Sequence, residues 1–258
     1  MIRMQKSAPS GTVLIDAPAS RNAFSREMLR QLADAIFDFH QDKSVRAVIV
    51  TSKGSTFCSG VNLKEWQSNS EELDAIEQWQ DIASELQDVI EAMLRLPKPI
   101  LAAIDGPALG FGMAIALACD LVVASDRAIF RIQSSKWGLV SGLTAPLLAF
   151  RCGASTAAGM LIGGEDLDSH RAHQLGLVHR LVPSEQIWAA ANAWVSQIAT
   201  SSAESMQLNK RLLNEMIGEN LLMQLSSGAA VLATACSTEA ATEGLRAFVD
   251  KRQPNFPS

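Results

Sequence analysis

The 258-residue sequence predicts an α/β fold in which strands and helices alternate along the first two hundred residues. Short runs rich in Val, Ile and Leu alternate with segments whose apolar residues recur at helical spacing. These strand candidates show little polar alternation, which is typical of a parallel sheet covered on both faces. After about Ser141 such runs become few and helical patterns dominate. We therefore expect an α/β core at 1–200 and a helical region at 201–258 that packs on the core or on a neighbouring subunit.

The elements of the core have local sequence signals. Ala-Pro-Ala ends the first strand, and Ser25 precedes a run whose apolar residues fall on one helical face. Pro97 ends a long helix, because proline interrupts helical hydrogen bonding. The expected strands are 12–16, 45–51, 99–104 and 120–125. The expected helices are 25–39, 73–96, 112–119, 143–150, 155–162, 169–175, 184–199, 203–217, 221–236 and 242–251.

The composition excludes several classes of partner. Lys and Arg number 22 against 27 Asp and Glu, a net charge of −5, so we expect no nucleic acid partner. The longest uncharged run, 220–238, is interrupted by polar residues, and no leader segment is evident, so we expect no membrane association. Widely spaced cysteines without a CxxC pair predict reduced thiols in a cytoplasmic protein. They are Cys58, Cys119, Cys152 and Cys236.

The sequence gives no signal for a metal or a tightly bound cofactor. Gly110-Phe-Gly112 begins like a dinucleotide fingerprint, but Ile115 occupies the position of the third glycine. His170, His173 and His179 lie near one another in sequence. No carboxylate or cysteine clearly completes a metal cluster around them, so we interpret them as surface histidines.

Two loops are the most informative features of the chain. Residues 56–65 and residues 106–114 each follow a buried strand, and ligands of open α/β sheets bind at the carboxyl ends of strands. Gly110 permits a tight turn, and the N–H of Phe111 would lie at a helix N-terminus. With the N–H of Val61 it could form an oxyanion hole. Glycine-rich turns of this kind also occur for structural reasons alone.

Several pieces of sequence, in matching order and at matching separations from about residue 10 to 254, carry a resemblance to a known family. They are Arg21-Asn-Ala23, Phe57-Cys-Ser-Gly-Val-Asn-Leu-Lys-Glu65, 99–110, 119–130, Ala172-His-Gln-Leu-Gly-Leu-Val178 and Phe248-Val-Asp-Lys-Arg252. Together they resemble the crotonase superfamily, also called the enoyl-CoA hydratase/isomerase family.

The resemblance implies a spiral of ββα turns and a C-terminal helical part that helps form trimers, often paired into hexamers. It implies an acyl-coenzyme A thioester as substrate, with coenzyme A present only as part of it. Carried over by position, the N–H donors to the thioester carbonyl are Val61 and Phe111. The family commonly has glycine at the second donor, so the Phe111 ring must point away or narrow the acyl channel. The residues expected along coenzyme A are Arg21, Ala23, Ser59, Asn62, Leu63, Lys64 and Gly110, with Lys251 as a candidate for its phosphates.

The chain departs from the family at the groups that would move protons. Hydratases that it resembles use two glutamates, and matching by position puts Ala114 and Ser134 there. The loop 139–144, where isomerases of the family place a carboxylate, contains no acid. Alanine cannot transfer a proton, and a serine hydroxyl is a weak acid and base near neutrality. The sequence therefore disfavours ordinary hydration.

Three functional hypotheses follow from this departure. The favoured one is decarboxylation or thioester cleavage of an acyl-CoA by enolate or oxyanion stabilisation, with Ser134 or Thr144 hydrogen-bonded to substrate or water. The second is an acyl-CoA binder without catalytic activity. The third is a hydratase or isomerase that uses an acid from elsewhere, and the candidates for that acid are Glu71, Glu72 and Glu77.

Overall fold

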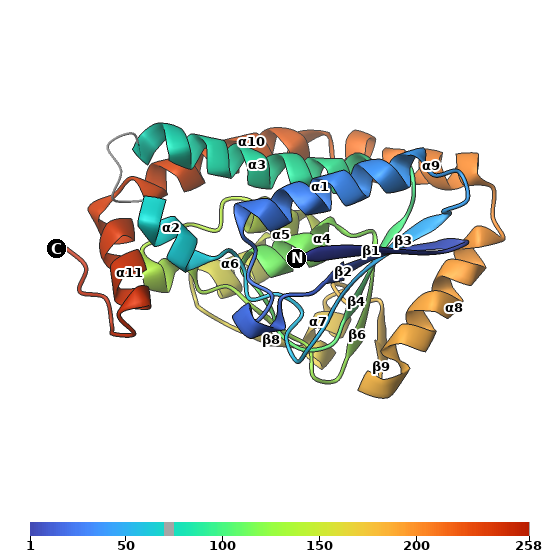
Figure 1. Ribbon diagram of the computed structural model, residues 1–258, viewed down its shortest axis with the longest axis horizontal. Coiled ribbons are helices and arrows are strands. Elements are labelled where there is room, and N and C mark those ends of the chain that lie inside the picture. The colour runs from blue at the N-terminus through green and yellow to red at the C-terminus, as the bar shows by residue number, and fades with distance from the viewer. Residues whose placement is uncertain (70–74, 258) are drawn as a thin grey trace.

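A six-stranded sheet forms the centre of the computed structural model, which describes residues 1–69 and 75–257 (Figure 1). The first two strands pair antiparallel, and all later neighbours in the order β1-β2-β3-β4-β6-β9 are parallel. These strands are β1 (Ile2–Ser7), β2 (Ser10–Ile15), β3 (Ala47–Ser52), β4 (Ile100–Ile104), β6 (Leu121–Ser125) and β9 (Arg180–Val182). A second sheet has the order β5-β7-β8 and consists of β5 (Ala108–Leu109), β7 (Ile129–Arg131) and β8 (Leu167–Asp168).

Both faces of the large sheet are covered, which explains why its strands lack polar alternation. Val48 and Val50 of β3 belong to the main hydrophobic core, on the face of the long helices. Ala47 and Ile49 point the other way, into a smaller core closed by α8 (Ile187–Ala199). Successive strand residues face opposite sides, so apolar residues are required at every position.

Three long helices lie together on the main face, α1 (Arg26–Gln41), α3 (Ala75–Arg95) and α10 (Glu219–Cys236) (Figure 1). The first begins as the sequence predicts, since the Ser25 hydroxyl accepts a hydrogen bond from the Met28 N–H at 3.2 Å. Below them lies α4 (Phe111–Ala118), in which all eight residues are buried. The elements that follow α4 are η2 (Ser134–Trp137), α5 (Thr144–Cys152), α6 (Ala154–Leu161), α7 (Ser169–Gln174) and η3 (Ser184–Gln186).

The C-terminal helices pack on the α/β core. Leu221 and Leu225 of α10 belong to the same hydrophobic cluster as the strand residues. Before this helix lie α9 (Ala203–Arg211) and a stretch of π-helix, η4 (Leu212–Ile217), and after it lies α11 (Glu239–Val249). Helix α11 packs against α2 (Leu63–Asn69), which begins within the first of the two loops, so the last helix lies beside the helix that this loop leads into (Figure 1).

The structure differs from the sequence prediction at several places. The strand β1 and the short elements β5, β7, β8, β9 and η1 (Pro18–Ser20) were not predicted. Helix α2 begins at Leu63, inside the segment predicted as a loop, and the first residues predicted for the long helix fall outside the described residues. Within the described chain no single helix is long and apolar enough to cross a membrane, although α10 and α11, bent by 74°, pass as a pair by length and composition.

Candidate active site

A cavity of about 600 Å³ lies where the two glycine-bearing loops meet the C-terminal helices. Its wall contains every predicted site residue except Lys251, which is exposed after the end of α11. The predicted residues in the wall are Arg21, Ala23, Ser59, Val61, Asn62, Leu63, Lys64, Gly110, Phe111 and Ser134. Segments far apart in the sequence thus meet at one concave surface, which is the usual setting of a small-molecule site.

Asn22 holds the first edge of this cavity in place. Its buried side chain donates hydrogen bonds to the carbonyls of Lys53 (2.9 Å) and Thr56 (2.7 Å) and accepts one from the Ala17 N–H (2.8 Å). The backbone of Asn22 is left-handed, with φ 58°. The carbonyl of Arg21 next to it accepts from the Ser59 N–H at 3.1 Å. These bonds hold residues 21–23 against the first loop.

Val61 lies in a turn whose other amides are already paired. Phe24 N–H donates to the Gly60 carbonyl, and Asn62 N–H donates to the Phe24 carbonyl, each at 2.8 Å. In such a parallel bridge, the N–H of Val61 points away from Phe24, because Phe24 bonds to the residues on either side of Val61. The N–H of Val61 accordingly has no acceptor among the described residues, although it lies in the cavity wall.

Phe111 begins helix α4 and offers a second amide of the same kind. Gly110 precedes it with φ 52° and ψ −115°, a conformation that glycine tolerates, and its N–H donates to the Arg131 carbonyl at 3.0 Å. Its carbonyl accepts from Met113 and Ala114 N–H at 3.0 and 3.1 Å. The Phe111 N–H has no acceptor in the described part of the chain, as expected at a helix N-terminus.

The two turns are in contact. A Cβ atom built on Gly60 would lie 3.7 Å from the Phe111 nitrogen and 4.0 Å from the Gly110 Cα. The N-terminus of a helix favours negative charge, because its first N–H groups carry partial positive charge. Two unpaired amides on touching turns, one of them at a helix N-terminus, can therefore stabilise an anionic oxygen.

The described wall of the cavity contains no Asp, Glu, His or Cys, and its ionisable residues are Arg21 and Lys64. Ala114 is fully buried in α4 and does not reach the cavity. Behind the wall, burial raises the pKa of the Cys58 thiol to about 12, so it stays neutral near pH 7. The site thus provides positive charge and amide donors, without an acid or base suited to neutral pH.

Three of the hydroxyl groups in the wall come from the segment 134–144. Ser134 Oγ lies 2.6 Å from Ser141 Oγ, so these two hydroxyls hydrogen-bond to each other. Thr144 Oγ1 donates to the Gly110 carbonyl at 3.3 Å, so its proton is directed at the protein. Of the two hydroxyls considered from sequence, Ser134 is the better placed to contact a ligand.

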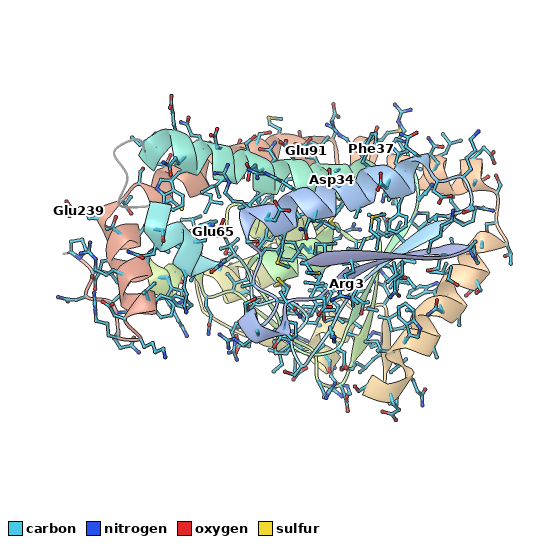
Figure 2. The ribbon with its side chains drawn as sticks, in the orientation of Figure 1. Arg3, Asp34, Phe37, Glu65, Glu91 and Glu239 are labelled. Carbon is cyan, nitrogen blue, oxygen red and sulfur yellow. The ribbon has the colours of Figure 1, made fainter. Side chains whose placement is uncertain are left out.

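Carboxylates near the cavity have other partners or positions. Glu65 on α2 accepts a hydrogen bond from the Arg26 N–H at 3.2 Å and so stabilises the first turn of α1 (Figure 2). Glu77 is exposed near the start of α3 and does not line the cavity. Glu71 and Glu72 lie outside the described residues.

The apolar wall includes residues that sequence reasoning did not assign to the site. Leu86 of α3, Leu232 of α10 and Phe248 of α11 all line the cavity. Their helical spacing is the same as that of core residues, so the sequence holds no separate signal for them. Trp66 also lines the cavity, and its ring centroid lies 5.4 Å from that of the core residue Trp79.

The histidines have structural contacts. His179 Nδ1 accepts from the Val122 N–H at 3.1 Å, and burial is the main cause of its lowered pKa. His173 Nδ1 lies 2.8 Å from the Val178 carbonyl oxygen. No group of three His, Cys, Asp or Glu within the described residues is arranged to hold a metal ion.

Comparison with known proteins shows the family of the chain. The sequence profile of the enoyl-CoA hydratase/isomerase family matches residues 8–258. The chain belongs to this family. Among its relatives is a Thermus thermophilus protein named "Putative enoyl-CoA hydratase", 33% identical over 99% of this chain and 100% of that protein. The 1,2-epoxyphenylacetyl-CoA isomerase of Escherichia coli is 28% identical over 95% of this chain and 94% of its own length.

Solved structures of this family share the fold. An enoyl-CoA hydratase from Mycobacterium avium subsp. paratuberculosis has a TM-score of 0.88 at 27% identity, over 100% of this chain and 98% of that one. The crotonase-like fold predicted from the sequence pieces is therefore confirmed. The names of the relatives include both a hydratase and an isomerase. Family membership therefore indicates acyl-CoA chemistry but does not identify one reaction.

Proposed function

We propose that this protein binds an acyl-CoA thioester in the cavity and stabilises an enolate through the amides of Val61 and Phe111. The observation that carries the proposal is the pair of unpaired N–H groups on touching turns in the cavity wall. Each such donor is typically worth about 10²–10³ in rate when it meets a developing oxyanion. The family's acyl-CoA chemistry supplies the oxygen, since a thioester carbonyl becomes anionic as an enolate forms.

Coenzyme A would enter along the cationic side of the cavity. Arg21 and Lys64 are the ionisable residues of the described wall. Both are cationic side chains, which bind the negatively charged phosphate groups of ligands. Ser59, Asn62 and Leu63 also line the cavity. Lys251 lies outside the wall and remains a candidate for a phosphate at its edge.

The reaction that these groups support best is decarboxylation of a thioester with a carboxyl group on its α carbon. The bond between the α carbon and the carboxyl carbon breaks, CO₂ leaves, and the electron pair passes to the α carbon and the thioester oxygen. Solvent later returns a proton to the α carbon. No base is needed, in contrast to hydration, isomerisation or thioester hydrolysis, and the described wall offers none.

The Ser134–Ser141 pair would hold the leaving carboxylate. One hydroxyl of the pair donates to the other, which leaves one proton free for a substrate oxygen. Leu139 and Leu143 also line this region of the cavity. An apolar wall disfavours a carboxylate relative to neutral CO₂, which assists the loss of CO₂.

The experiment compares substrates that need different chemistry. The purified protein is given malonyl-CoA, an alkylmalonyl-CoA and crotonyl-CoA, and the products are separated by chromatography and weighed by mass spectrometry. We expect loss of CO₂ from a malonyl thioester and hydration of crotonyl-CoA near background. Rapid hydration would overturn the proposal, whereas binding of all three without turnover would identify a non-catalytic acyl-CoA binder.

We further propose that the protein works in the cytoplasm as a trimer or a dimer of trimers. The four cysteines are unpaired, which fits a reducing compartment. The C-terminal helices expose apolar side chains that a partner copy would cover. They include Leu208, Leu212, Leu213, Met216, Met223 and Val231. Light scattering should give three or six times the 27.7 kDa chain mass; a monomer would contradict this.

A further inference from the structure

Two aromatic rings connect the turns that carry the amide donors. The ring centroids of Phe24 and Phe111 lie 5.7 Å apart, with their planes at 73°, the edge-to-face arrangement that aromatic pairs favour. Phe24 is 1% exposed and Phe111 7%. Phe24 does not line the cavity, so the Phe111 ring makes this contact with a residue outside the cavity wall.

Each ring belongs to a residue that positions one donor. The backbone of Phe24 is hydrogen-bonded on both sides of Val61, to Gly60 and to Asn62. Phe111 itself carries the second donor. A displacement of either ring is therefore transmitted to one of the two amides through a single residue.

From this arrangement we propose that Phe24 and Phe111 form a brace that fixes the separation of the Val61 and Phe111 amides. The inference rests on the proposed oxyanion hole and assigns both phenylalanines as positioning residues. Two donors act together on one oxygen only when their spacing and direction are held, because hydrogen bonds weaken steeply with angle. No other ring pair recorded in the described chain joins these turns.

The alternative is that both rings only fill the core. Leucine would then serve at either position with a loss of stability alone, since it is apolar and keeps the backbone N–H. If the two rings form a brace, leucine at either position removes the same ring contact. The brace therefore predicts that the two substitutions are not additive.

The test measures how well the protein distinguishes a carbonyl from a methylene group. Calorimetry gives Kd values for butyryl-CoA and for S-butyl-CoA, the thioether that lacks the carbonyl oxygen. The variants are Phe24→Leu, Phe111→Leu and the double variant. Phe39→Leu is the matched control, since Phe39 is equally buried in the same core and lies outside the cavity wall.

We expect the wild type and Phe39→Leu to bind the thioester at least about tenfold more tightly than the thioether, from two hydrogen bonds. Each brace variant should reduce this preference, expressed as the ratio of the two Kd values, to less than about threefold, and the double variant should lose no more. The carbonyl stretch of bound butyryl-CoA, labelled with ¹³C at the carbonyl, should move toward its solution value in the same variants.

The outcomes separate the brace from the proposed function. If the wild type shows no preference for the thioester, the oxyanion hole and the brace both fail. If the wild type shows the preference and folded Leu variants keep it, the brace alone is wrong. Circular dichroism checks folding. If a Leu variant does not fold, Phe24→Met or Phe111→Met replaces it at the same position, since the flexible side chain of Met fills irregular space.

Discussion

Lys210 Nζ lies 2.8 Å from Asp120 Oδ2, in an ion pair that joins the C-terminal helices to the core sheet. The ammonium also donates to the carbonyls of Met93 (2.9 Å) and Lys98 (3.0 Å). The same carboxylate oxygen accepts from the Ile100 N–H at 2.7 Å, at the start of β4. A lysine in α9 thus completes the hydrogen bonding of the segment that leads into a central strand.

We expect Lys210→Met to destabilise the protein strongly. The Lys210 side chain is 5% exposed, so its loss leaves Asp120 partly buried without its countercharge. Breaking a buried pair by removing one partner typically costs about 3–5 kcal/mol. Urea denaturation should show this loss. Arg211→Met is the control, because the side chains of Arg211 and Glu215 are 65% and 35% exposed, and exposed pairs contribute about 0–1 kcal/mol; equal losses would contradict the assignment.

The donor role of Phe111 is tested most directly by removing its N–H. Phe111→Pro places proline at the first residue of α4, where a helix tolerates it. We expect kcat for decarboxylation to fall by about 10²–10³. Phe111→Leu keeps the N–H and is the control for the lost ring. A kcat of Phe111→Pro equal to that of the wild type would show that the N–H has no role.

The sequence was informative where local chemistry decides the structure. The Ser25 cap, the stop at Pro97 and the glycine turn before α4 are local signals, and each lies where it was expected. Strand β1 was missed because five of its six residues are exposed, so it has no apolar pattern. Its place depends on pairing with β2, which is a tertiary contact.

The same distinction applies to the site. Val61 and Phe111 could be named from their loops, since an N–H that follows a glycine turn has a local signature. The proposed role of the Phe24 ring could not be named from the sequence, because Phe24 and Phe111 are far apart in the chain and only the fold brings their rings together. The place of Leu86 and Leu232 in the cavity wall could not be predicted either, since only packing distinguishes a wall residue from a core residue.

The hydroxyl pair should matter for carboxylated substrates alone. We expect Ser134→Ala to lower kcat/KM for malonyl-CoA by about tenfold or more, the effect of one hydrogen bond to a charged group. Binding of butyryl-CoA, which has no such carboxylate, should change little. Ser141→Ala should give a smaller effect if Ser134 makes the contact, and a larger one if Ser141 does. Unchanged turnover in both variants would exclude a role for the pair.

The final prediction concerns the dependence of turnover on pH. Because the described cavity wall lacks Asp, Glu, His and Cys, decarboxylation should proceed without a titrating protein group near neutrality. The nearest thiol does not alter this, since burial raises the Cys58 pKa to about 12 and the thiol remains protonated at lower pH. We expect kcat to vary by less than about threefold between pH 4 and 9, a range that includes the ordinary pKa values of Glu and His, where a general acid or base would produce a sloping limb.

A hydratase or isomerase that recruits an acid from elsewhere makes the opposite prediction. Its rate would fall on one side of the pKa of that acid, and replacing the acid would flatten the profile. Glu77→Gln is the informative variant, because Glu77 is the one of the three candidate acids that lies within the described residues. It is exposed near the start of α3 and lies outside the described cavity wall. A flat profile that this substitution leaves unchanged supports catalysis by the two amides. A limb that disappears in Glu77→Gln would instead make Glu77 the proton carrier and refute the decarboxylation mechanism.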